Sequence, residues 1–290
     1  MSVVVITGAR GLVGSHLLPL FSQADELHVL VRSRSTEYEG LPNVRQHVSD
    51  LAGHLDLSSL PPRIDSVVHL AQSPRFREFP EQALDVFDVN VSSLVRLLDY
   101  ARRAGAKSFL IASSGGLYGS SKDPVREDTQ VTSTGQLGFY LSSKLCSEIL
   151  AESYAAFMNV TVLRLFFVYG PGQRRSMLIP RLIDSVRFGK GVALSGPEGI
   201  RINPIHALDA AVACKAALTI EGMRMINVAG PETHTLREIC HLIGVRLGIE
   251  PVFDFRPASE AEDLVADITL MKNTLVPPGR LLADHLHELL

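Results

Sequence analysis

The chain has 290 residues, 46% of them hydrophobic, and a formal net charge of −3 at pH 7, which suits one large α/β domain with a smaller lobe. This charge provides no basic field for a nucleic acid, and no apolar run is long enough to cross a membrane. Three widely spaced cysteines without a CxxC pair favour reduced thiols. We therefore expect a soluble, cytoplasmic protein that binds neither nucleic acid nor membrane.

Short β-branched runs alternate with amphipathic stretches along the chain. This alternation predicts βαβ units, in which a parallel sheet carries helices on both faces. We therefore predict an α/β fold, a Rossmann-type doubly wound parallel sheet with a smaller C-terminal substrate lobe. The expected strands are 3–7, 27–31, 66–71, 108–113 and 160–168; the dinucleotide-binding domain is 1–170, with 203–230 returning to it, and the substrate-binding lobe is 171–290.

The first predicted strand runs into the glycine-rich sequence TGARGLVG at 7–14, and a helical pattern follows. Its glycines, Gly8, Gly11 and Gly14, suit a tight turn, close approach of backbone to a pyrophosphate, and packing of helix on strand. The N-terminus of the helix offers free N–H groups and a positive dipole to phosphates. The sequence therefore predicts a dinucleotide site at these glycines and Leu12.

The second predicted strand ends at Val31, where a NAD enzyme would normally carry an acidic residue for the ribose 2′-hydroxyl. Here Arg32 follows the strand, and a guanidinium would instead accept a 2′-phosphate. We therefore favour NADP as cofactor. NAD is the alternative, and Arg32 would then stack on the adenine or be solvated.

Between the third and fourth strands, apolar residues recur at steps of three and four from Leu84 to Ala101. This spacing predicts one long helix over 81–104 that Gly105 ends. The apolar stripe would cover the sheet, and any excess of it could pair with a second subunit.

The sequence YLSSK places Tyr140 and Lys144 on one face of a predicted helix. Free tyrosine has a pKa near 10. Lowering that pKa to 7 takes about three units, or roughly 4 kcal/mol of stabilisation of the phenolate. The combined effect of a lysine cation and the positive charge of an oxidised nicotinamide on the tyrosine pKa has the right size and sign for this. Tyr140 would exchange a proton with a substrate hydroxyl as hydride moves at the same carbon, and Ser114 could hydrogen-bond the reacting oxygen.

Taken in chain order, these motifs resemble those of the extended short-chain dehydrogenases/reductases of the NAD-dependent epimerase/dehydratase family. The resemblance covers about the first 230 residues and implies that Ser114, rather than Ser113, joins Tyr140 and Lys144 in the catalytic set. It further implies cofactor contacts from Asp50, Leu51, Leu70, Ala71, Tyr140, Lys144 and Phe167, and substrate contacts from Ser73, Ser114, Phe167 and Arg201.

Three features of the sequence depart from the family's pattern. Its dehydratases carry Asp-Glu after the catalytic hydroxyl residue, whereas this chain has Gly115 and Gly116, which disfavours sugar dehydration. An asparagine commonly precedes the family's VYG motif, and that position is Phe167 here. The usual acidic residue after Arg201 is also missing, which weakens the case for a nucleotide sugar, although Arg201 could still meet a pyrophosphate.

The family resemblance implies NAD(P)-dependent hydride transfer at a carbinol or ketone carbon, by a nucleotide-sugar epimerase or a keto-sugar reductase. A reductase of a non-sugar carbonyl is one alternative, because Phe166 and Phe167 stand at the expected pocket wall. A non-catalytic NADP-binding sensor or assembly protein is the other. Members of the family commonly form dimers, so the resemblance implies a homodimer built from helices 81–104 and 139–157.

We expect no metal site. His285 and His287 near the C-terminus have no carboxylate cluster beside them and are expected to be solvated, while His206 is expected to be structural.

Overall fold

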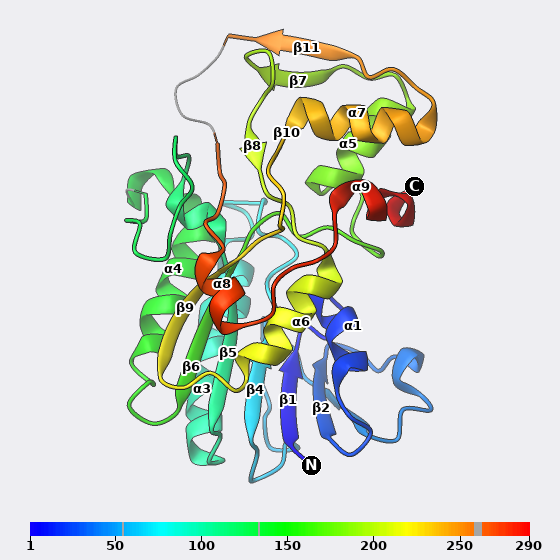
Figure 1. Ribbon diagram of the computed structural model, residues 1–290. Helices are drawn as coiled ribbons and strands as arrows, with labels where there is room; N and C mark the ends of the chain where they lie inside the picture. The colour runs from blue at the N-terminus through cyan, green and yellow to red at the C-terminus, as the bar shows by residue number, and fades with distance from the viewer. Residues whose placement is uncertain (54, 133, 258–262) are drawn as a thin grey trace.

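The computed structural model describes residues 1–53, 55–132, 134–257 and 263–290. Its centre is a seven-stranded sheet in the order β3-β2-β1-β4-β5-β6-β9, and every pair in it is parallel (Figure 1). The strands are β1 (Val3–Thr7), β2 (Glu26–Val31), β3 (Val44–Val48), β4 (Ser66–His69), β5 (Ser108–Ser114), β6 (Asn159–Leu165) and β9 (Met223–Val228).

The strand order reverses between β1 and β4, as in a doubly wound fold, and this confirms the predicted Rossmann-type sheet. Val4 and Ile6 of β1 are buried in one apolar cluster, and Val5 is buried in a second. Since neighbouring side chains of a strand point to opposite faces, the two clusters are the two sides of the sheet. The reversal opens a ligand crevice at the carboxyl ends of the central strands.

Helices cover both faces of the sheet. Helices α1 (Leu12–Leu17) and α6 (Ala207–Ala217) contribute to the first apolar cluster, and α3 (Ser93–Arg103) and α4 (Gly138–Glu152) contribute to the second. The long helix predicted over 81–104 consists of α2 (Ala83–Phe87), a π-helical turn at Asp88–Ser92, and α3.

A third apolar cluster forms a lobe above the carboxyl ends of the strands (Figure 1). Its elements are α5 (Leu178–Arg187), β7 (Val192–Ser195), β8 (Arg201–Ile202), β10 (His234–Thr235), α7 (Leu236–Leu247), β11 (Phe253–Arg256) and α9 (Leu282–His285). Helix α8 (Thr269–Thr274) instead packs beside β9. No helix within the described ranges is long and apolar enough to cross a membrane.

Candidate active site and cofactor crevice

The glycine-rich turn joins β1 to α1, and two of its glycines leave no room for a side chain. Gly8 has φ +71°, and a Cβ atom there would lie 2.6 Å from the backbone nitrogen of Ala71. A Cβ atom on Gly14 would lie 2.2 Å from the carbonyl oxygen of Gly8. Glycine is therefore required at both positions, and the bare backbone suits the close approach of a phosphate. The structure thus brings Leu70 and Ala71, assigned to the cofactor from the sequence, against this turn.

A buried pair fixes the ends of β1 and β4 next to the turn. Thr7 Oγ1 lies 2.8 Å from Nδ1 of His69, and the same hydroxyl oxygen accepts from the N–H of Ala71 at 3.3 Å. Burial lowers the pKa of His69 to about 3, so the ring is neutral at pH 7. His69 therefore serves as a structural partner at the floor of the crevice rather than as a charged group.

The side of the crevice formed by the ends of β2 and β3 carries charges of both signs. Arg32 directly follows β2 and is exposed, as is Asp50 after β3, whose Oδ1 accepts from the N–H of Ala52 at 3.0 Å. Arg10, inside the glycine turn, forms an ion pair of 3.1 Å with Glu37. Glu37 gave no signal in the sequence because it stands several residues beyond the end of β2 instead of directly after it.

The three predicted catalytic residues converge at the carboxyl end of β5. Tyr140 and Lys144 extend from α4, and Nζ of Lys144 lies 6.0 Å from the centre of the Tyr140 ring. That ammonium donates to the carbonyl oxygen of Ala112 at 2.9 Å. Ser114 ends β5 and accepts from the N–H of Gly116 at 3.1 Å, and its hydroxyl acts to lower the pKa of Tyr140.

Burial dominates the proton affinities of this site. It raises the pKa of Tyr140 to about 12, against an opposing hydrogen bond with Ser114. It lowers the pKa of Lys144 to about 8, against the opposing charge of Glu148. In the protein alone, burial therefore favours the protonated phenol, and the lowering of the Tyr140 pKa expected from Lys144 together with an oxidised nicotinamide stays a prediction. The positive charge of an oxidised nicotinamide would act in that direction.

Gln72 contacts Tyr140, a contact that was not expected from the sequence. The Tyr140 hydroxyl donates to Oε1 of Gln72 at 3.0 Å, and the ring of Phe76 lies 4.9 Å from the Tyr140 ring. Both residues come from the segment after β4. Their spacing along the chain gives no periodic signal, so only the fold could reveal them.

The geometry contradicts the substrate role expected for Ser73. This serine is completely buried, its N–H donates to Oδ1 of Asn90 at 3.0 Å, and its hydroxyl donates to Asp85. The same hydroxyl oxygen accepts from the N–H of Arg75 at 3.0 Å. With every polar atom of its side chain engaged, Ser73 anchors the segment after β4 to α2.

Two phenylalanines shape the region where β6 leaves the sheet. Phe166 is buried, and its ring fills the space beside Gly115, where a Cβ atom would lie 2.4 Å from Cζ. Phe166 therefore packs in the core and does not line a pocket, which removes half of the argument for a non-sugar carbonyl. Phe167 is partly buried and has φ +42°, a left-handed conformation that is costly for an aromatic residue.

Arg201 already has a carboxylate partner. Its Nε donates to Oδ2 of Asp263 at 2.7 Å, and its backbone N–H donates to Oδ1 of the same side chain at 2.7 Å. No acidic residue directly follows Arg201 in the sequence. Asp263, 62 positions further along the chain, takes that place in the structure. The guanidinium is still half exposed, so a contact with substrate stays a prediction.

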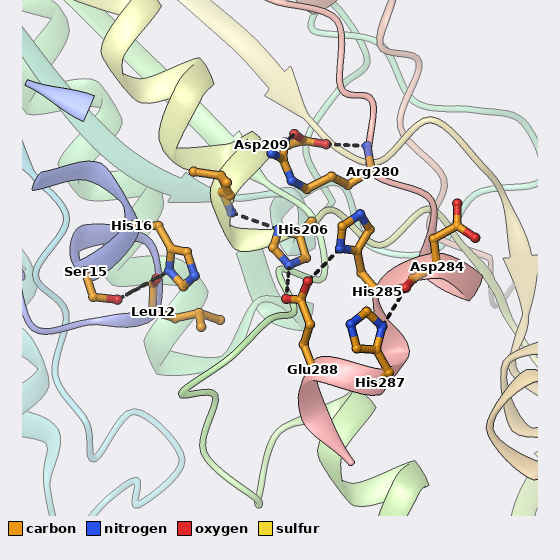
Figure 2. A network of polar contacts seen from close by, with 11 residues as sticks. Leu12, Ser15, His16, His206, Asp209, Arg280, Asp284, His285, His287 and Glu288 are labelled. Carbon is orange, nitrogen blue, oxygen red and sulfur yellow. Dashed lines mark hydrogen bonds and ion pairs between the residues drawn. The ribbon is translucent and has the colours of Figure 1, made fainter. Parts of the chain in front are cut away.

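A histidine cluster ties the C-terminus to the start of α6, as Figure 2 shows. The carboxylate of Glu288 lies 3.1 Å from Nε2 of His206 and 2.7 Å from Nδ1 of His285. The expectation that His285 is solvated is therefore wrong, because Glu288 and the His206 ring, 5.0 Å away, both contact it. His287 instead donates from Nδ1 to the carbonyl oxygen of Asp284 at 2.7 Å.

These three side chains are close enough to hold a metal ion, but the tautomer of His206 opposes it. Nδ1 of His206 accepts from the N–H of Leu208 at 3.2 Å, so the proton of the neutral ring is on Nε2, which faces Glu288. A metal bound through Nε2 would move that proton to Nδ1, where it would face a donor. The cluster therefore fits a hydrogen-bonded clasp better than a metal centre.

Comparison with known proteins agrees with this geometry. The model of the NAD dependent epimerase/dehydratase family matches residues 4–231. A dTDP-4-dehydro-6-deoxy-D-allose reductase from a Streptomyces species is 28% identical over 84% of this chain and 81% of its own length. The UDP-glucuronic acid 4-epimerase of Bacillus cereus, solved with UDP-glucuronic acid and NAD, is 25% identical, with TM-score 0.84 over 99% of this chain and 97% of that one. With its glycine turn and its Ser-Tyr-Lys set in place, the chain belongs to the NAD dependent epimerase/dehydratase family.

Proposed function

We propose that this enzyme moves hydride reversibly at a sugar carbon that alternates between carbinol and ketone in a nucleotide sugar, as a keto-sugar reductase or a 4-epimerase. The observation that carries the proposal is the convergence of Ser114, Tyr140 and Lys144 at the carboxyl end of β5. The reductase and the epimerase described above are by their names nucleotide-sugar enzymes, which supports this substrate class.

The residues of this chain would divide the work as follows. Gly8, Gly11 and Gly14 would hold the pyrophosphate of the dinucleotide, whose nicotinamide supplies or accepts the hydride. Tyr140 would give its phenolic proton to the reacting oxygen or take one from it, and Ser114 would hydrogen-bond that oxygen. The Lys144 ammonium would favour the phenolate during the proton exchange.

Dehydration is the family activity that this site supports least. The position that follows Ser114 must remain glycine because the Phe166 ring occupies the space beside it. A carboxylate therefore cannot stand directly after the catalytic serine, where the family's dehydratases carry one. Reduction and epimerisation need no such carboxylate, and both remain open to this chain.

Replacement of Tyr140 by phenylalanine tests the proposal. We expect Tyr140→Phe to lower kcat/KM by about 10²- to 10⁴-fold, both for reduction of a dTDP-4-keto-6-deoxy sugar and for epimerisation of UDP-glucuronic acid. The first reaction is followed by loss of reduced-nicotinamide absorbance and the second by chromatography. Turnover within about threefold of the wild type on the substrate that the enzyme accepts would contradict the assigned role.

We further propose NADP as the preferred cofactor, because the exposed guanidinium of Arg32 follows β2 directly. The carboxylate of Glu37 would instead suit the ribose 2′-hydroxyl of NAD. Its ion pair with Arg10 partly neutralises it. Calorimetric titration of cofactor-stripped protein should favour NADP by tenfold or more, about 1.4 kcal/mol. Arg32→Ala should remove the preference, and Arg45→Ala, on β3, is the matched control. A preference for NAD in the wild type would overturn the proposal.

A homodimer built on α3 and α4 is proposed from the apolar side chains that these helices and α2 expose. Leu84 is 79% exposed and Ile149 is 58% exposed, and Phe87 and Val95 are exposed as well. Light scattering should report a dimer at micromolar concentration, and Leu84→Glu with Ile149→Glu should shift it to monomer. A wild-type monomer would contradict this arrangement.

A cytoplasmic location stays a prediction, motivated by the three free cysteines.

A further inference from the structure

Gln72 holds the proton of the Tyr140 hydroxyl. The phenol donates to Oε1 of Gln72 at 3.0 Å, so its proton points at that amide oxygen. In the proposed reaction the same proton has to reach the reacting oxygen of the substrate. The amide oxygen and the substrate oxygen therefore compete for one donor, and Gln72 must give up this contact before the proton can move.

The contact with the phenol is not needed to fix the chain around Gln72. The next residue, Ser73, is completely buried, and Asn90 and Asp85 bind its N–H and its hydroxyl. The Phe76 ring packs 4.9 Å from the ring of the catalytic tyrosine. The segment after β4 is thus held against α2 and α4 without the amide of Gln72, which is an exposed residue.

The amide of Gln72 is free to turn. Its Nε2 has no hydrogen-bond partner among the residues that the structure describes, so rotation of the amide breaks only the contact with the phenol. A carboxamide carries an acceptor oxygen and two N–H donors. After half a rotation about its last side-chain bond, it presents an N–H to the phenol oxygen in place of Oε1. It therefore suits the phenol as an acceptor and the phenolate as a donor.

The charged groups near the phenol do not bond to its oxygen in the described part of the chain. Nζ of Lys144 lies 6.0 Å from the centre of the tyrosine ring and donates to a carbonyl oxygen of β5. The guanidinium of Arg77 lies 5.1 Å from the centre of the Phe76 ring. Both cations favour a phenolate through space. Ser114 has its proposed role at the reacting oxygen, so Gln72 is placed to donate to the phenolate itself.

We propose that Gln72 is a further catalytic residue, whose amide accepts from the protonated phenol and, once turned, donates to the phenolate that the reaction forms. This inference rests on the hydride-transfer function proposed above. In reduction, hydride passes from the reduced nicotinamide to the carbonyl carbon, and the phenol proton passes to the carbonyl oxygen. The phenolate left on Tyr140 then accepts an N–H of Gln72. Carbinol oxidation runs the same steps in reverse and starts from the phenolate.

Two substitutions of Gln72 separate the donor from the acceptor. Gln72→Met keeps the length of the side chain and removes both functions. Gln72→Glu keeps the acceptor and removes the donors, and its negative charge opposes a phenolate. On the acidic side of the pH profile for carbinol oxidation, Gln72→Met should lower kcat/KM by about tenfold, the size of one hydrogen bond to a charged group, and Gln72→Glu should lower it further. A Gln72→Glu enzyme as active as the wild type would overturn the proposal, because an acceptor alone would then be enough.

The position of the acidic limb separates this role from a contact with substrate. Oxidation needs the phenolate, so the acidic limb of kcat/KM reports the ionisation of Tyr140 in the complex with the oxidised dinucleotide. In Gln72→Met that limb should move to higher pH by about one unit, while the plateau at higher pH changes little. A residue that binds only substrate would instead lower kcat/KM by one factor at every pH, and that result would also overturn the proposal.

Gln82→Met is the matched control. Gln82 is the carboxamide at the other end of the same segment, where its Oε1 accepts from Arg75 instead of from the phenol. This variant should leave the acidic limb in place. Because Gln72 is exposed, its variants should fold as the wild type does, which circular dichroism would check.

The two levels of the proposal fail in different ways. Failure of the hydride-transfer function would show as full activity in Tyr140→Phe. An inactive Tyr140→Phe together with an unmoved acidic limb in Gln72→Met would leave that function standing and overturn only the role of Gln72.

Discussion

A methyl group on Gly115 would lie 2.4 Å from Cζ of Phe166, so these two residues fit together only as a glycine and an aromatic ring. We predict that Gly115→Ala costs about 1–3 kcal/mol of unfolding free energy, the usual cost of overpacking a core. Urea unfolding followed by circular dichroism would measure it. Adding Phe166→Leu should recover part of the loss, because the smaller side chain leaves room for the methyl group.

Gly116→Ala is the matched control for this prediction. Its Cβ atom would lie 3.1 Å from Cδ2 of Leu141, the end of a flexible side chain that can move aside. Its cost should therefore be clearly smaller than that of Gly115→Ala. Equal costs would show that the Phe166 ring does not set the requirement for glycine.

The adjacent hydroxyls of Ser113 and Ser114 should behave in opposite ways. Ser114→Ala removes the hydrogen bond proposed for the reacting oxygen, so kcat/KM should fall by about 10²-fold with little change in stability. Ser113 is buried, and within the described part of the chain its Oγ has no hydrogen-bond partner. Ser113→Ala should therefore leave activity unchanged and keep or raise the melting temperature. The opposite pattern would reassign the catalytic serine.

The C-terminal clasp should make the protein sensitive to acid. Burial lowers the pKa of His206 below 6.5, so the native state resists a proton that the unfolded chain accepts, and stability falls as pH drops below 6.5. Burial alone would raise the pKa of Glu288, but hydrogen bonds from His285 and His206 outweigh it and lower that pKa below 4.5. This contribution is present above pH 4.5 and is lost below it.

The double variant His206→Asn with Glu288→Gln should flatten this dependence. Thermal unfolding between pH 4 and pH 7.5 would show a smaller fall in melting temperature than in the wild type. Asparagine is a good N-cap residue, so the start of α6 should survive the exchange. His287→Asn, outside the clasp, is the control and should keep the wild-type slope. An unchanged slope in the double variant would exclude the clasp as the source.

Five of the seven strands of the main sheet could be predicted from the sequence because each carries its own signal, whereas the two edge strands, β3 and β9, were not predicted. Runs such as VVVIT at 3–7 are continuous, β-branched and bounded by turns, and alternating helices enforce a parallel order. The glycine turn and the Tyr140–Lys144 pair were equally readable, since both are local patterns with fixed spacing. The short strands of the lobe were not, because β8 and β10 have two residues each and depend on their partners.

What the sequence could not provide are contacts across long separations. Asp263 meets Arg201, and Glu288 meets His206, at separations of 62 and 82 residues. Local periodicity carries no trace of such pairs, and only the fold brings them together. The Ser73 assignment failed for a related reason, since the distant Asp85 and Asn90 occupy the polar atoms that the substrate was expected to use.

From α5 onwards the chain passes back and forth between the lobe and the sheet. After α5 and β8 in the lobe come α6 and β9 at the sheet, then α7 and β11 in the lobe, α8 beside β9, and α9 in the lobe. Neither part can lose its structure without pulling segments out of the other, so the protein should melt as one cooperative unit. A ligand that binds between them would then protect both from unfolding.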